Sequence, residues 1–169
     1  FNNIAYQLQT NSNYYNEGSL NAYLDTNNVS VDSFSIAHLN IRSISAHLSE
    51  FQACMDDIRH PFSVYAFTET WLNETNQACY GLPGYNHVNV VRQGRTGGGV
   101  SLFVSDVLEF NEIHELTGIN NDMESVLIEI SLCNINIIVG AIYRPPDTDL
   151  NVFNAMHDNH VDILKGRSC

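Results

Sequence analysis

The chain has 169 residues, of which 44% are hydrophobic, and this size suits one domain with a packed core. No apolar run approaches the roughly 18 residues of a membrane-spanning helix. The net charge is −12, from 7 Lys+Arg against 19 Asp+Glu, which argues against a dedicated duplex-binding module. A metal-dependent enzyme remains open, because metal sites need carboxylates.

The four cysteines indicate where the protein works. Their spacing shows no CxxC pair and no disulfide framework, and no basic segment followed by an apolar one marks a signal peptide. We therefore expect reduced thiols in a nuclear or cytoplasmic protein that is not secreted and does not enter a membrane. The first residue is Phe1 and not Met, which suggests a fragment or a processed chain.

The first 33 residues are rich in Asn, Ser and Tyr and show weak periodicity. This composition predicts a poorly ordered lead-in over residues 1–33, with a short helix near Leu20–Leu24. The character changes at Phe34, so we place the folded domain at residues 34–169.

The domain opens with a predicted strand, a helix and a second strand. Phe34–Asn40 has the pattern of a buried strand. An apolar stripe with helical spacing follows, and Ser43 precedes it as a candidate N-cap. Pro61 ends this helix, and the strand Phe62–Phe67 runs into Glu69. The stripe consists of Ile44, Leu48, Phe51, Met55 and Ile58.

The rest of the domain is rich in strands. Two apolar runs separated by Cys133-Asn134 predict a hairpin, and helical spacing returns at the C-terminal end. The pattern predicts an α+β fold in which the sheets are mainly antiparallel. The expected elements are strands Tyr85–Arg92, Val100–Ser105, Phe110–Leu116, Val126–Leu132 and Ile135–Tyr143, and a helix over Asp149–Lys165.

Polar residues at strand ends are the best candidates for chemistry. Asn40 ends the first strand, Glu69 follows the second, and Tyr143 with Arg144 ends the last. Together these groups suit phosphate chemistry, because a carboxylate binds Mg²⁺ and a guanidinium binds phosphate. From spacing alone, Asn40 could equally be a turn residue, Glu69 a helix cap and Tyr143 an edge aromatic.

Several other features leave alternatives open. Gly97–Gly99 lacks the Lys-Ser/Thr of a P-loop and precedes a strand, so it predicts a hairpin loop near DNA. His157, His160 and Asp162 could bind a metal from one helix face, but a solvated polar face is the commoner outcome for such spacing. Glu124 is either a support for the metal site or a surface carboxylate.

Four motifs occur in a fixed order along the chain. They are His38-Leu-Asn-Ile-Arg-Ser-Ile44, Phe67-Thr-Glu-Thr-Trp-Leu72, Gly97-Gly-Gly-Val100 and Ala141-Ile-Tyr-Arg-Pro-Pro146. Together they resemble the endonuclease/exonuclease/phosphatase superfamily, specifically the endonuclease domain of LINE-type (non-LTR) retrotransposons, which is related to apurinic/apyrimidinic endonucleases. The resemblance covers about residues 34–165.

The resemblance implies a fold and a set of roles. The fold is a four-layer sandwich, in which two facing sheets are flanked by helices. Asn40, Glu69 and Tyr143 match the catalytic positions: Glu69 binds Mg²⁺ or Mn²⁺, Asn40 orients the metal site, and Tyr143 contacts the scissile phosphate. Arg144 matches the retrotransposon Tyr-Arg-Pro-Pro variant, and we expect Arg42, Arg95 and Arg144 to bind substrate. The implied activity is nicking of target DNA, and the implied partner is a downstream reverse transcriptase domain.

The chain also departs from the family. The Gly-Asp-Phe-Asn and Ser-Asp-His motifs are absent, so the resemblance implies a C-terminally truncated domain whose second half is largely missing. We expect this chain to be nearly inactive and marginally stable, with the inner faces of Phe34–Leu39 and Ile135–Ile142 lacking a full partner sheet. The alternatives are a lipid or inositol-phosphate phosphodiesterase or phosphatase of the same superfamily, and a non-catalytic remnant.

Overall fold

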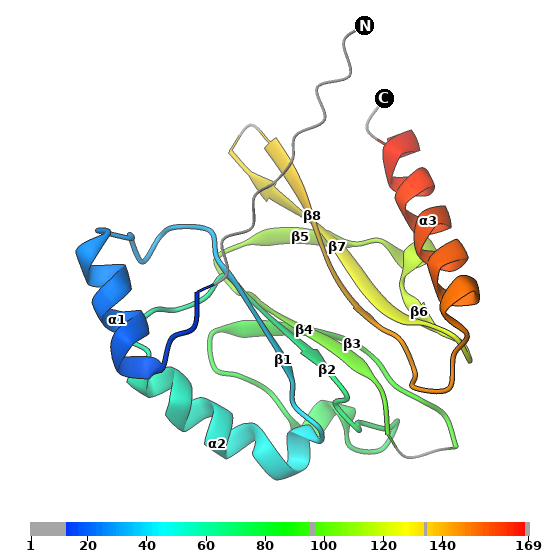
Figure 1. Ribbon diagram of the computed structural model, residues 1–169, viewed down its shortest axis with the longest axis horizontal. Coiled ribbons are helices and arrows are strands. Elements are labelled where there is room, and N and C mark those ends of the chain that lie inside the picture. The colour runs from blue at the N-terminus through cyan, green and yellow to red at the C-terminus, as the bar shows by residue number, and fades with distance from the viewer. Residues whose placement is uncertain (1–12, 95–96, 134, 168–169) are drawn as a thin grey trace, which may run out of the picture.

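The computed structural model describes residues 13–94, 97–133 and 135–167. Two four-stranded sheets face one another, and helices lie on their outer sides (Figure 1). The first sheet has the order β1-β2-β4-β3, in which β1 and β2 are parallel and the other neighbours antiparallel. Its strands are β1 (Ile36–Asn40), β2 (Val64–Thr68), β3 (Tyr85–Val90) and β4 (Val100–Ser105).

The second sheet is antiparallel throughout and is centred on one long strand. That strand, β7, pairs along one edge with β8 and along the other with β5 and β6. Its strands are β5 (Glu109–Glu112), β6 (Gly118–Ile119), β7 (Glu124–Leu132) and β8 (Ile135–Tyr143). The α+β fold with mainly antiparallel sheets is thus confirmed, as is the hairpin formed by β7 and β8.

Helices cover the outer face of each sheet (Figure 1). The apolar stripe of α2 packs on β2 and β4, where the Phe51 ring meets the edge of Phe67 with 4.8 Å between centroids. Ile163 and Leu164 of α3 pack on a smaller cluster beside β7. The helices are α1 (Glu17–Thr26), α2 (Ile44–Asp57) and α3 (Leu150–Arg167), with short 3₁₀ helices η1 (Gln77–Cys79) and η2 (His114–Leu116). None of the helices in the described ranges combines the length and apolarity that crossing a membrane requires.

The main core lies between the two sheets. Side chains alternate along β2, so Val64 and Ala66 face the second sheet whereas Tyr65 and Phe67 face α2. The same inter-sheet core takes residues from β4, β7 and β8. Burial on both faces explains why β2 and β4 are mostly apolar and do not alternate between apolar and polar residues.

The expectation that two inner faces lack a partner is only half right. It is wrong for β8, because the β7–β8 hairpin brings Val139 and Ala141 into the inter-sheet core, where each is 5% exposed. It fits β1 better, where Ile36 is 46% exposed. Within the described residues β1 pairs only with β2, so one of its edges is open.

Two predicted element ends differ from the structure. The strand expected over Phe110–Leu116 ends at Glu112, because residues His114–Leu116 form η2. Ser43 stands at the N-cap position, but its hydroxyl contacts Ser45 and makes no capping bond, since its φ of 92° is not the extended conformation of a cap. The N-terminal segment contains the short helix predicted near Leu20–Leu24. This helix is α1, and it contacts α2 through a hydrogen bond from Asn21 Nδ2 to the Asp57 carbonyl at 2.7 Å.

Residues 1–12 of the expected lead-in lie outside the described residues, and the domain boundary at residue 34 stays a prediction.

Candidate active site

The three residues predicted to be catalytic come together at one rim of the sandwich. Because β1 and β2 are parallel and Asn40 pairs with Thr68, Asn40 and Glu69 leave the sheet side by side. Asn40 Nδ2 donates to Glu69 Oε1 at 2.9 Å, and the Tyr143 hydroxyl donates to the same oxygen at 3.2 Å. Two amino-acid side chains from different sheets thus converge on one carboxylate.

The Glu69 carboxylate retains capacity to bind a cation. Within the described ranges, neither Glu69 Oε2 nor Asn40 Oδ1 receives a hydrogen bond, and Glu69 is half-buried while Asn40 is exposed. One carboxylate beside one amide oxygen suits Mg²⁺, which keeps several waters and needs few protein ligands. In the same ranges no three His, Cys, Asp or Glu side chains gather as a metal-binding group.

Tyr143 is held in its protonated form. Burial raises the pKa of the Tyr143 phenol above its ordinary value of 10.0, and the Glu69 carboxylate beside it adds to the shift. The hydroxyl is therefore a hydrogen-bond donor at neutral pH, available to the carboxylate or to a phosphate oxygen.

The backbone around Glu69 is strained. Glu69 and Trp71 have φ values of 54° and 56°, in the left-handed region that residues with a side chain avoid. Such a conformation costs about 1–3 kcal/mol per residue and persists only where surrounding contacts hold it. Here the Glu69 carbonyl accepts from Ser43 N at 2.8 Å and Trp71 N donates to the Gly98 carbonyl at 2.9 Å.

A second carboxylate lies below this rim and was only partly foreseen. Glu124 is fully buried, so the alternative of a surface carboxylate is wrong. It forms an ion pair with Arg92 Nε, and its other oxygen accepts from Gly99 N at 2.5 Å. In the sequence, Glu124 is recognisable only as a single acidic residue at the start of an apolar strand. Nothing in the sequence indicates that it pairs with Arg92.

The three predicted substrate-binding arginines differ in their surroundings. Arg144 Nη1 donates to the Thr148 carbonyl at 2.9 Å, so this side chain closes the turn after β8. Arg42 is exposed beside Asn40, has a φ of 46°, and makes no hydrogen bond or ion pair within the described part of the chain. Arg95 lies outside the described residues.

The glycine loop and the histidines of α3, which the sequence left open, have different roles in the structure. Gly97–Gly99 belongs to the connection of the β3–β4 hairpin, as predicted. His160 is neither a metal ligand nor part of a solvated face, because its ring nitrogens meet the carbonyls of Met156 and Leu116 at 3.0 and 3.3 Å. It therefore holds α3 against η2, whereas His157 is exposed and pairs with Asp158.

Comparison with solved structures places this geometry in a known fold. No protein-family model matches the sequence, and no curated protein matches it. The endonuclease domain of TRAS1, a telomere-specific non-LTR retrotransposon, aligns with 75% of this chain at 16% identity and a TM-score of 0.54. The chain has the fold of that endonuclease domain.

The predicted resemblance is thereby confirmed at the level of the fold. The chain spans about half of the TRAS1 domain, since the alignment covers 52% of that chain. A 3′ phosphatase, NExo from Neisseria bound to product DNA hairpin, aligns with 63% of this chain and 40% of its own at 18% identity. Its TM-score of 0.37 is too low to bear on the fold.

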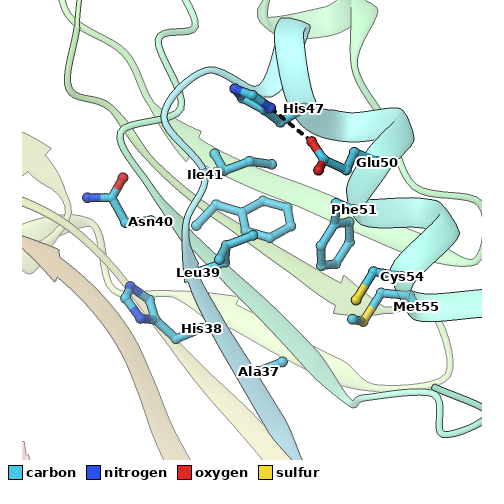
Figure 2. A pocket seen from close by; sticks show the side chains of 11 residues that line it. Ala37, His38, Leu39, Asn40, Ile41, His47, Glu50, Phe51, Cys54 and Met55 are labelled. Atoms are coloured by element: carbon cyan, nitrogen blue, oxygen red, sulfur yellow. Dashed lines mark hydrogen bonds and ion pairs between the residues drawn. The ribbon is translucent and has the colours of Figure 1, made fainter. Parts of the chain in front are cut away.

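An apolar groove of about 410 Å³ runs between β1 and α2, beside the site. Figure 2 shows Phe51, Cys54 and Met55 on the helix side of this groove and Asn40 on the other side of β1. Asn40 lines the groove and also bonds Glu69 at the polar rim, so the groove and the rim adjoin at this residue. The groove follows the open edge of β1 and holds none of the other proposed catalytic residues.

Proposed function

We propose that this chain supplies part of the active site of a Mg²⁺-dependent DNA endonuclease. The observation that carries the proposal is the convergence of Asn40 and Tyr143 on the Glu69 carboxylate, at a rim where oxygen ligands remain open. Glu69 and Asn40 would hold Mg²⁺ or Mn²⁺. When bound, the metal would polarise a phosphodiester and offset charge on its oxygens during attack by water.

Each residue at the rim has a role under this proposal. Glu69 anchors the cation, the Asn40 amide fixes the orientation of that carboxylate, and the protonated Tyr143 hydroxyl donates to a phosphate oxygen of the substrate. Arg42, Arg95 and Arg144 bind the DNA backbone, because a guanidinium can contact phosphate oxygens in pairs.

The proposed biological role is nicking of target DNA to leave a 3′-hydroxyl that primes reverse transcription. Its support is the fold shared with an endonuclease domain of a non-LTR retrotransposon. The proposed partner is a reverse transcriptase domain downstream in the same polyprotein. A Tyr-x-Asp-Asp motif in the downstream coding sequence would support this role, whereas a stop codon soon after a Ser-Asp-His motif would favour a stand-alone phosphatase of the same superfamily.

We further propose that the 169-residue chain is inactive by itself and binds DNA weakly. The family's Gly-Asp-Phe-Asn and Ser-Asp-His motifs, which position the water and stabilise the phosphate, are absent from the sequence. Seven basic residues offer little phosphate neutralisation, on which non-specific DNA affinity mainly depends. Sub-micromolar binding to duplex DNA at physiological salt, measured by fluorescence anisotropy, would contradict weak binding.

The proposed setting is the nucleus or cytoplasm. Cys54, Cys79 and Cys133 are free thiols, which is the state that those compartments maintain.

A nicking assay tests the activity. In a form of the domain that continues through the two missing motifs, we expect Mg²⁺-dependent relaxation of supercoiled plasmid, abolished by Glu69→Ala. The matched control is Glu74→Ala, which removes an exposed carboxylate from the neighbouring loop and should leave nicking unchanged. Nicking that survives Glu69→Ala would remove Glu69 from the site.

A further inference from the structure

One buried carboxylate joins the second sheet to a loop of the first. Glu124 is the first residue of β7 and is fully buried. One of its oxygens accepts from Arg92 Nε and the other from Gly99 N. Arg92 follows β3 and Gly99 precedes β4, so a single side chain holds both ends of the β3–β4 connection.

The same connection is bonded to the segment that carries Glu69. Thr70 N donates to the Gly99 carbonyl at 3.2 Å, and Trp71 N donates to the Gly98 carbonyl. The approach is close enough to require glycine: a Cβ at Gly98 would overlap the Arg92 guanidinium and lie 2.6 Å from Glu124 Oε1. A Cβ at Gly99 would overlap the Thr70 hydroxyl. Contacts therefore run without a gap from Glu124, through the glycines, to residues 70 and 71.

The segment 69–71 needs this support. Glu69 and Trp71 occupy the disfavoured left-handed region, and the hydrogen bonds from one side come from the start of α2. On the opposite side the carbonyls of Gly98 and Gly99 accept from Trp71 N and Thr70 N, and Glu124 in turn holds Gly99 by its N–H. Since Glu124 lies opposite Tyr143 in the β7–β8 register, the same strand pair also delivers the phenol to Glu69.

We propose that Arg92 and Glu124 are positioning residues, whose buried ion pair fixes the β3–β4 connection and thereby holds Glu69 in its strained conformation. Neither residue would touch metal or substrate. The inference deepens the proposed function, and it rests on that function only where it expects a change in metal affinity.

The fluorescence of Trp71 reports directly on the conformation of residues 69–71. It is the only tryptophan in the chain, and its Nε1 would lie 3.9 Å from a Cβ at Gly97. In Arg92→Met, Glu124 stays buried without its cationic partner, so we expect the Trp71 emission and its quenching by acrylamide to change. We also expect the affinity for Mn²⁺, measured by electron paramagnetic resonance, to fall about tenfold or more.

The matched control is Arg167→Met. Arg167 also pairs with a carboxylate, Glu115, but its side chain is 38% exposed and lies in α3. We expect both the Trp71 signal and the Mn²⁺ affinity of this variant to equal those of the unaltered chain.

A double variant separates positioning from simple stability. In Arg92→Met/Glu124→Leu the buried charges are gone, and well-packed apolar substitutes commonly restore the stability lost when one partner is removed. We expect the melting temperature to recover while the Trp71 signal and Mn²⁺ affinity stay altered, because Gly99 N still lacks its acceptor. Recovery of the melting temperature, the Trp71 signal and the Mn²⁺ affinity together would overturn the proposal. An unchanged Trp71 signal in Arg92→Met would also overturn it. If Glu69→Gln binds Mn²⁺ as well as the unaltered chain does, the proposed metal site fails, and the Trp71 signal alone decides the positioning role.

Discussion

Tyr143 donates its phenolic hydrogen to Glu69 Oε1 at 3.2 Å, although Tyr143 ends a strand of the second sheet and Glu69 follows a strand of the first, 74 positions away in the sequence. The bond exists only because the sheets pack face to face through the core formed by β2, β4, β7 and β8. The candidate site is therefore a product of sheet packing, and changes that loosen this packing should disturb the site.

The glycine-rich connection provides a stability test. Gly98→Ala should lower the free energy of unfolding by about 2 kcal/mol or more, because alanine is strained at a φ of +68° and its Cβ would overlap the Arg92–Glu124 pair. Gly81→Ala is the matched control, since no atom lies within 4 Å of an added Cβ there and its φ is not positive. Urea denaturation compares the two. Equal stabilities would show that the 97–99 loop tolerates a side chain and that the packing described at Gly98 is wrong.

The pH dependence of stability should carry a signature of His87. Burial lowers the pKa of His87 to about 4, from an ordinary value of 6.5. The unfolded chain therefore takes up a proton at a pH where the folded chain does not, so this contribution to stability is fully present above pH 6.5 and is lost as the pH falls toward 4. Between pH 7 and pH 5 the loss should be about 2 kcal/mol.

Replacing His87 isolates this effect from other titrating groups. The ring stacks on Phe103 with 4.1 Å between centroids, so His87→Phe keeps the stacking and removes the titration. Its stability should fall less between pH 7 and pH 5 than that of the unaltered chain, whereas His157→Gln, at an exposed histidine, should behave like the unaltered chain. Identical pH profiles for all three proteins would mean that His87 titrates normally in the folded state.

The open edge of β1 should make the chain prone to association. Unpaired backbone groups beside exposed Ile36 and Leu39 offer a template for another strand, and a lysine on such an edge discourages pairing. Ile36→Lys should reduce the growth of large particles in light scattering at high protein concentration. The control is Val107→Lys, at an apolar residue that is 82% exposed but lies in a turn. This variant should form large particles as fast as the unaltered chain. If both variants aggregate as fast as the unaltered chain, association arises elsewhere.

Much of the fold could be predicted because its signals are local. The helical stripe from Ile44 to Ile58 and the apolar runs of β2, β4, β7 and β8 follow directly from which faces are buried. The positions of Asn40 and Glu69 at strand ends were equally readable, and the parallel pairing of β1 and β2 brings them together.

What escaped prediction depends on contacts between distant segments. The pairing of Arg92 with Glu124 joins residues 32 positions apart across the two sheets, and neither side chain signals its partner. His160 reads as a surface residue until α3 docks on η2. Ser43 has the identity of an N-cap, but hydrogen bonds to the Glu69 and Thr70 carbonyls fix the entry to α2 in another conformation.

The most direct test of the proposed site is a titration of the 169-residue chain with Mn²⁺, followed by electron paramagnetic resonance of the free ion. We expect a saturable site whose affinity for Mn²⁺ falls by about tenfold or more in Glu69→Gln and stays the same in Glu74→Gln, whose carboxylate is exposed and lies outside the Asn40–Glu69–Tyr143 rim. Equal Mn²⁺ affinity in Glu69→Gln and the unaltered chain would contradict the assignment of this rim as a metal site.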